Sequence, residues 1–184
     1  MRKAIITGIR QGGVVDVSTP QAKENWVVVK VHTTPMCTEY KSFLAGTPSQ
    51  QLGHEAAGEV VEVAQPGRWK VGDRVVVMPQ NPCGVCPLCL AGEYIHCQDV
   101  ADFASIHGSR EGSATMAQYL LKQAHQLIPI PNGMSYDHAS HGLLRAGTDL
   151  WQPGTGGRWH AGYSFDHRAG TGGAGRGDQC QLPG

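Results

Sequence analysis

Short runs of β-branched residues, separated by turn-forming dipeptides, dominate the chain up to about residue 130. Four of these runs predict β-strands, at Lys3–Thr7, Trp26–Val31, Glu59–Val63 and Arg74–Met78. The predicted turns that bound them are Gly12-Gly13, Pro66-Gly67 and Gly72-Asp73. Two more strands are predicted at Met116–Leu121 and Gln126–Ile130, the second edged by proline. Because helical periodicity is scarce here, the pattern favours a small β-barrel or sandwich.

The pattern changes after Ser140. Residues 141–184 show neither helical nor strand periodicity and hold nearly half of the 25 glycines of the chain. This composition is typical of a disordered glycine-rich tail. The sequence therefore predicts a folded domain at residues 1–140 and a disordered segment at residues 141–184.

Length and charge exclude several classes of function. With 184 residues and a formal net charge of zero, the chain has no basic patch of the kind that binds nucleic acid or an anionic membrane. The N-terminus has no signal-peptide pattern, and no apolar run reaches the length of a membrane span. We therefore expect a soluble cytoplasmic protein, whose cysteines stay reduced and available to metals.

Four of the six cysteines lie in one short stretch, PCGVCPLCLAGEYIHC. Cys83, Cys86, Cys89 and Cys97 have the spacing C-x2-C-x2-C-x7-C, which lets four thiolates converge on one tetrahedral zinc ion. An iron–sulfur cluster is the main rival, although the bacterial ferredoxin motif ends differently. Disulfides are the simplest alternative, which a reducing compartment disfavours.

A second group of metal-ligating residues is spread over two segments. Cys37 follows one predicted strand, and His54 and Glu55 precede another. Taken singly, a cysteine is usually a small buried apolar residue and a histidine a hydrogen-bonded structural one. If the strand ends meet, a thiolate, an imidazole and a carboxylate can form an open zinc site.

Three motifs in order then show a family resemblance: GHEAAGEVVEV, KVGDRVVV and the four-cysteine loop. Residues 1–140 resemble the amino-terminal GroES-like domain of zinc-dependent medium-chain alcohol dehydrogenases, including the segment GSATMAQYLL that returns the chain to the barrel. The resemblance implies a mostly β, GroES-like barrel. It makes Cys37 and His54 catalytic-zinc ligands and Glu55 the nearby acid that can approach or ligate the metal. The four clustered cysteines become the ligands of a structural zinc.

The proton relay departs from the family pattern. The family usually has Ser or Thr two residues after the first cysteine ligand, whereas this chain has Thr38 directly after it and Glu39 in the second place. Either residue could serve as the relay.

The family also places a Rossmann domain after the barrel, and residues 141–184 do not resemble one. The segment RAGTGGAGRG has the glycines but neither the preceding apolar strand nor the following helix. Degenerate codons read from the second base permit Met-Ala-Cys-Cys-Gly-Leu-Gly-Pro-Thr from residue 141, and Ile-Thr-Gly-Leu-Gly-Pro-Val-Gly-Leu-Gly from residue 166. The second string contains a dinucleotide fingerprint. We hypothesise a one-base slip near codon 141; a natural glycine-rich tail is the alternative.

The resemblance implies an oxidoreductase that interconverts a small-molecule alcohol and its aldehyde or ketone. Zinc is the expected cofactor of this chain. NAD(P) is expected only in a full-length version, so we assign no cofactor-binding residue and expect the chain alone to be inactive. A zinc-stabilised, non-catalytic binding module is the alternative, and a zinc-ribbon nucleic-acid binder is disfavoured by the neutral charge. The substrate, the choice between NAD and NADP, and the oligomeric state stay open, a homo-oligomer of the full-length form being one option.

Overall fold

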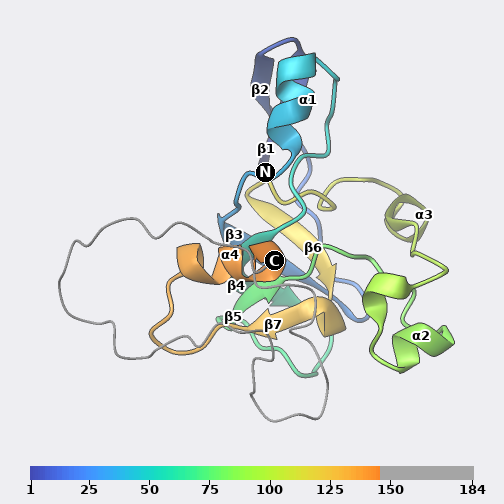
Figure 1. Ribbon diagram of the computed structural model, residues 1–184. Helices are drawn as coiled ribbons and strands as arrows, with labels where there is room; N and C mark the ends of the chain where they lie inside the picture. Colours follow the sequence, from blue (N-terminus) through green and yellow to red (C-terminus); the bar gives the residue numbers. More distant parts are fainter. Residues whose placement is uncertain (146–184) are drawn as a thin grey trace, which may run out of the picture.

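The computed structural model describes residues 1–145, and residues 146–184 lie outside the described part (Figure 1). Most of the predicted tail, 141–184, therefore cannot be compared with the structure. None of the described helices is long and apolar enough to cross a membrane.

A five-stranded antiparallel sheet forms the centre of the described region. Its strand order is β6-β3-β4-β5-β7. The strands are β3 (Trp26–Thr33), β4 (Ala56–Val63), β5 (Arg74–Val77), β6 (Tyr119–Gln123) and β7 (Leu127–Pro129). Their buried valines and leucines pack around Trp69 in the largest apolar cluster. The domain is thus mostly β, as the runs of β-branched residues predict.

A two-stranded sheet of β1 (Arg2–Gly8) and β2 (Gln11–Asp16) extends from the central sheet together with helix α1 (Glu39–Ala45) (Figure 1). The predicted turn at Gly12-Gly13 is wrong, because both glycines pair with β1, opposite Ile6 and Ile5. The chain turns instead near Arg10, which has φ +52° and whose N–H donates to Phe43 O of α1. Tertiary pairing thus overrides the turn preference of the two glycines.

Strand β6 lies a few residues later than the predicted Met116–Leu121. Its pairing with β3 runs from Tyr119, opposite Lys30, to Gln123, opposite Trp26. Met116 instead accepts a hydrogen bond from Ala4 N–H of β1 and donates to Leu52 O. The sequence did not predict the end of β6 because Lys122 and Gln123 are polar, although both are buried in the structure.

Several short helices also escaped prediction. Helices α2 (Pro87–Leu90) and α3 (Phe103–His107) and the 3-10 turn η1 (Tyr94–His96) belong to the excursion between β5 and β6, which Figure 1 shows to one side of the sheet. A second 3-10 turn, η2 (Ala124–Gln126), follows β6.

Helix α4 (Tyr136–Arg145) continues through the predicted boundary at Ser140. At its amino end, the Ser135 hydroxyl accepts the backbone N–H of His138. Tyr136 stacks on His32 of β3, with ring centroids 4.2 Å apart, and the Arg74 guanidinium of β5 lies over the same Tyr136 ring, 4.5 Å from its centroid. These contacts attach α4 to the sheet, so its first turns belong to the folded domain.

Candidate metal centres

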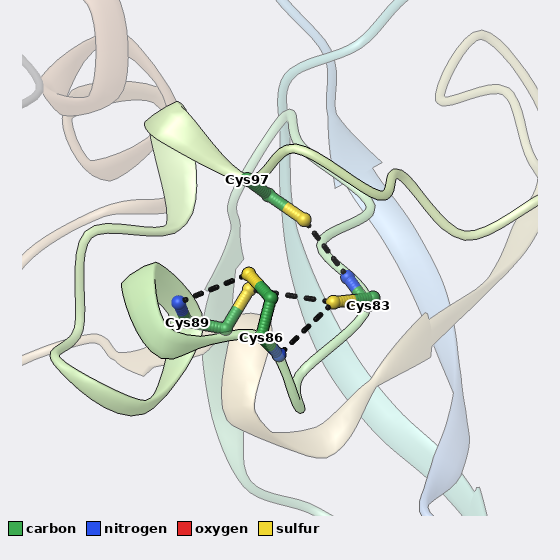
Figure 2. Close-up of side chains that lie close together, drawn as sticks. All are labelled: Cys83, Cys86, Cys89 and Cys97. Atoms are coloured by element: carbon green, nitrogen blue, oxygen red, sulfur yellow. Dashed lines mark hydrogen bonds between the residues drawn. The ribbon is translucent and has the colours of Figure 1, made fainter.

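The four clustered cysteines all face one point (Figure 2). Cys86 is the N-cap of α2 and Cys89 lies within that helix, while Cys97 directly follows η1. Backbone N–H groups point at the sulfurs: Cys83 N–H donates to Cys97 Sγ at 3.3 Å, and Cys86 N–H to Cys83 Sγ at 3.4 Å. The turns of the loop therefore bring the sulfurs together, and their N–H groups stabilise negative charge on the sulfurs.

The spacing of these sulfurs fits a tetrahedral ion. All four lie within 4.8 Å of one another, and Cys83 Sγ and Cys89 Sγ are 3.9 Å apart. A tetrahedron with zinc–sulfur bonds of about 2.3 Å has sulfurs about 3.8 Å apart. The cysteines are free rather than disulfide-bonded. The donor set is thus suited to a closed structural zinc site.

The thiols of this group differ in acidity. The hydrogen bond from Cys89 N–H lowers the pKa of Cys86 to about 6, and the one from Cys83 N–H lowers the pKa of Cys97. Burial raises the pKa of Cys89 to about 12. A bound divalent cation would deprotonate such a buried thiol outright, because it favours the thiolate.

The second group is also brought together. Ligand atoms of Cys37, His54 and Glu55 lie within 4.8 Å of one another. Cys37 precedes α1, and His54 and Glu55 directly precede β4. The Thr34 hydroxyl donates to Glu55 O at 2.8 Å and so ties the two segments together.

Gly53 permits the sharp approach to His54. It has φ +83°, and a Cβ atom there would lie 2.3 Å from Thr115 Oγ1. Only glycine combines this left-handed backbone with so close a neighbour.

Glu39 holds both segments of the second group. Its Oε2 accepts the Cys37 N–H at 2.9 Å, and its Oε1 lies 2.9 Å from His54 Nδ1. The other ring nitrogen, His54 Nε2, faces Glu55 and lies 3.4 Å from its Oε1. A carboxylate on one ring nitrogen is the usual partner of a metal-binding histidine, because it fixes the tautomer and ring orientation.

The two carboxyl groups beside His54 have opposite shifts. Burial raises the pKa of Glu39, but hydrogen bonds from the N–H groups of Glu39 and Cys37 and attraction to His54 lower it overall. Burial dominates for Glu55 and raises its pKa, although His54 opposes this. Glu39 is therefore the more strongly ionised of the two.

The sequence prediction missed this contact of Glu39, which it considered only as a proton relay. Thr38, the other relay candidate, is the N-cap residue of α1, and its side chain makes no capping hydrogen bond. A signal was available, since a carboxylate at the start of a helix, two residues after a cysteine, can reach back to the backbone of that cysteine. Relay roles for Thr38 and Glu39 stay predictions.

Residues 23–132 match the family described as the alcohol dehydrogenase GroES-like domain. The chain belongs to this family. The GroES-like fold expected from the sequence motifs is thereby confirmed, together with the mostly β architecture and the clustering of the four cysteines.

The curated proteins that this chain resembles include named dehydrogenases. The chain is 35% identical over 131 residues to the zinc-type alcohol dehydrogenase-like protein YdjJ of Escherichia coli, covering 66% of this chain and 37% of that protein. It is 29% identical over 172 residues to the sorbitol dehydrogenase of Bacillus subtilis, covering 84% and 47% respectively. The chain thus spans less than half of the length of these relatives.

A solved structure shows the same fold. An Escherichia coli oxidoreductase/dehydrogenase of unknown specificity superposes with a TM-score of 0.61 at 29% identity, over 76% of this chain and 42% of that one. The match again covers less than half of the length of that protein.

Proposed function

We propose that this chain is the metal-binding domain of a zinc-dependent oxidoreductase that interconverts an alcohol and its aldehyde or ketone with NAD(P). The observation that carries the proposal is the convergence of Cys37, His54 and Glu55 from two segments that are separate in the sequence. Membership in the alcohol dehydrogenase family supports it. The small-molecule alcohol itself and the choice of NAD or NADP are left open.

The two donor sets suit two different metal roles. Four thiolates without an oxygen or nitrogen donor are typical of a closed structural zinc site. Cys37, His54 and Glu55 provide a mixed set of three protein ligands, and catalytic zinc sites use three protein ligands plus water or substrate in the fourth position. Zinc bound there would polarise an alcohol oxygen and lower its pKa.

The protein groups around the mixed set have separate roles in this proposal. Glu39 holds the His54 ring with Nε2 toward the metal position, and it fixes the backbone at Cys37 through Oε2. Glu55, whose pKa burial raises, is 4% exposed and is the nearby acid. We assign the movement of the alcohol proton to Thr38 or Glu39, because these residues adjoin Cys37.

We propose further that the 184-residue chain, assayed by itself, binds zinc without turning over alcohol. No dinucleotide-binding glycine motif occurs between strand and helix in residues 1–145, and the relatives are more than twice as long as the matched part. The proposed frame change near codon 141 would account for the unusual composition of residues 141–184. The nucleotide sequence tests it, since codons that do not encode Cys-Cys and Gly-Leu-Gly in the shifted frame exclude it.

Metal stoichiometry tests the proposed function. The purified full chain should contain close to two equivalents of zinc. Cys86→Ser should remove the structural equivalent and lower the thermal stability, while Cys37→Ser should remove the other with little loss of stability. Cobalt substitution distinguishes the sites, because a tetrathiolate and a mixed sulfur–nitrogen–oxygen site have different absorption spectra.

A single equivalent of zinc, lost in Cys86→Ser and kept in Cys37→Ser, would contradict the proposal and favour a zinc-stabilised binding module. NAD-dependent turnover by the isolated chain would contradict the proposed inactivity. The reducing cytoplasm is the compartment that keeps these thiols available to metal, and we propose it as the location.

A further inference from the structure

A group of buried polar side chains lies where β6 ends, beneath the four-cysteine loop. Lys122 is 6% exposed, and its Nζ donates to Gln80 O at 2.5 Å and to Asn81 Oδ1 at 2.8 Å. None of the ion pairs in residues 1–145 involves it. Burial lowers the pKa of Lys122 to about 7, and in either protonation state the nitrogen has enough N–H groups for both acceptors. Burial of a lysine without a carboxylate partner costs folding free energy, which its two hydrogen bonds offset only in part.

The next residue, Gln123, also holds the segment before Cys83. Gln123 Nε2 donates to Pro82 O at 3.0 Å in a buried hydrogen bond. Together, Lys122 and Gln123 hold three consecutive residues, Gln80, Asn81 and Pro82, immediately before Cys83.

His125 completes the contact from η2. A Cβ atom on Gly84, which follows Cys83, would lie 3.6 Å from His125 Cε1, so the imidazole lies next to that glycine. The His125 ring also contacts Tyr94 of η1, with centroids 5.2 Å apart. The segment that leads to Cys83 is therefore contacted by β6, and the turn that precedes Cys97 is contacted by η2, which directly follows β6.

The loop has little apolar packing that could replace these contacts. Val85, Leu90 and Ile95 are largely exposed, and Cys89 is the buried residue of α2. A loop of this kind depends on its metal and on polar contacts at its base, because burial of apolar surface contributes little to it.

We propose that Lys122, Gln123 and His125, here termed the β6 platform, are positioning residues for the four-cysteine site. The platform fixes the backbone on both sides of Cys83 and the turn before Cys97, so that the sulfurs are preorganised around the metal. This inference rests on the proposed zinc occupancy of the loop. By this inference, residues that do not bind the metal themselves contribute to its affinity. Residues that hold metal ligands in place commonly have such an effect.

The test is the rate of zinc loss from the full chain. Zinc-loaded wild type and Lys122→Met are mixed with a colorimetric chelator, and release of the Cys86-dependent equivalent is followed. Met replaces the apolar stem of the lysine with an unbranched side chain one heavy atom shorter, and it removes both hydrogen bonds. Release should accelerate by about 10-fold or more, the size of effect that loss of such a partner has on metal affinity.

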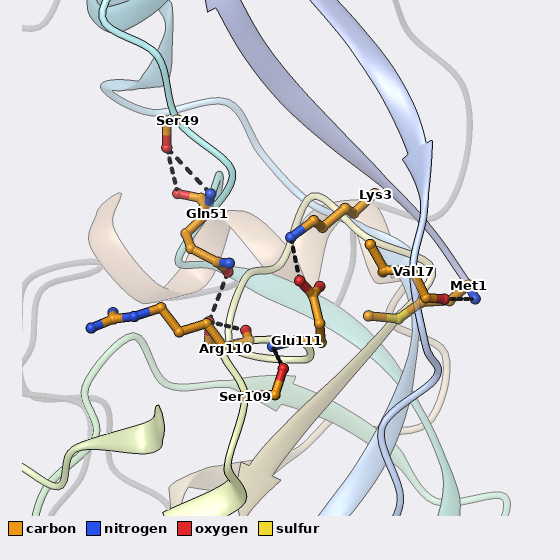
Figure 3. A network of polar contacts seen from close by, with 9 residues as sticks. Met1, Lys3, Val17, Ser49, Gln51, Ser109, Arg110 and Glu111 are labelled. Carbon is orange, nitrogen blue, oxygen red and sulfur yellow. Dashed lines mark hydrogen bonds and ion pairs between the residues drawn. The ribbon is translucent and has the colours of Figure 1, made fainter. Parts of the chain in front are cut away.

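Lys3→Met is the matched control. Lys3 is as deeply buried, at 3% exposed, but it pairs with Glu111 at 2.9 Å, away from the loop (Figure 3). This variant measures the general effect of deleting a buried lysine, and its release rate should stay within about twofold of the wild type at temperatures where both are folded. Equal acceleration in the two variants would overturn the proposal.

Hydrogen exchange keeps the proposal testable apart from metal release. Gln123→Met removes only the bond to Pro82 O and should increase amide exchange in residues 80–97 while exchange in β3 and β4 is unchanged. Unchanged exchange in the loop in both Gln123→Met and Lys122→Met would overturn the platform. Absence of the Cys86-dependent zinc in the wild type would instead overturn the proposed metal site, and with it the metal-positioning role.

Discussion

Glu39 Oε1 lies 2.9 Å from His54 Nδ1, which joins the start of α1 to the residue two positions before β4. The same carboxylate accepts the N–H of Cys37, so one side chain fixes two of the three candidate ligands of the mixed site. These two hydrogen bonds hold the Cys37 segment and the His54 segment together without the help of a metal ion.

Removal of this carboxylate should weaken the mixed site selectively. In Glu39→Ala the His54 ring loses its orienting partner, and zinc affinity at that site should fall about 10- to 100-fold. The four-cysteine equivalent should be retained. Metal competition with a chelator measures both.

Glu59→Ala is the control, because Glu59 also lies beside a histidine, His32, at 4.0 Å, but both of these side chains are about one-third exposed and neither belongs to the mixed site. It should leave both equivalents unchanged. A Glu39→Ala chain that holds zinc like the wild type would show that the contact does not support the site.

Gly58 allows β3 and β4 to approach closely. A Cβ atom there would lie 2.2 Å from Lys30 O, so Gly58→Ala should lower the free energy of unfolding by about 1–3 kcal/mol through overpacking. Urea denaturation measures the change.

Gly13→Ala tests the same substitution in open space. Gly13 lies in β2, where a Cβ atom would have no neighbour within 4 Å. The free energy of unfolding should change by less than about 1 kcal/mol. Comparable destabilisation at the two positions would contradict the argument from the close approach.

Arg74 attaches α4 to the sheet, because it lies 4.5 Å from the Tyr136 ring centroid and donates through Nη2 to Met134 O. Arg74→Met should lower the free energy of unfolding by about 1–3 kcal/mol, since it removes a partly buried cation–π contact and a charged hydrogen bond. Thermal or urea unfolding measures the change.

Arg68→Met is the matched control for this contact. Arg68 lies 4.8 Å from the Trp69 centroid, but it is exposed. Its removal should cost no more than about 0.5–1 kcal/mol. Equal losses in both variants would mean that the contacts of α4 add nothing beyond a surface cation–π pair.

His107 should make stability fall in mild acid. Burial against Trp26 and Phe103 lowers its pKa, the charge of Lys23 lowers it further, and Glu24 opposes the shift. Because the folded state resists protonation, stability from this group is full above the unfolded pKa of about 6.5 and decreases as pH falls below that value.

Unfolding free energies measured between pH 7.5 and 5 test this expectation. His107→Gln should show a shallower decrease than the wild type, whereas the exposed His138→Gln should follow the wild type. An unchanged slope in His107→Gln would exclude the histidine as the source.

Two parts of this protein follow from the sequence alone. The β-branched runs determine strands β1, β3, β4 and β5, because alternating bulky side chains suit a pleated, half-buried surface. The spacing of Cys83, Cys86, Cys89 and Cys97 determines a candidate zinc loop, since ligands so close in sequence converge through local turns.

The remaining features were decided by tertiary structure. Gly12 and Gly13 form a strand instead of a turn because β1 pairs with them, and buried Lys122 lies in a strand because its acceptors come from another segment. The contacts of Cys37, Glu39 and His54 likewise depend on how α1 and β4 are placed. Such contacts join residues that are distant in sequence, and the energy of a packed fold, rather than local preference, determines which of them meet.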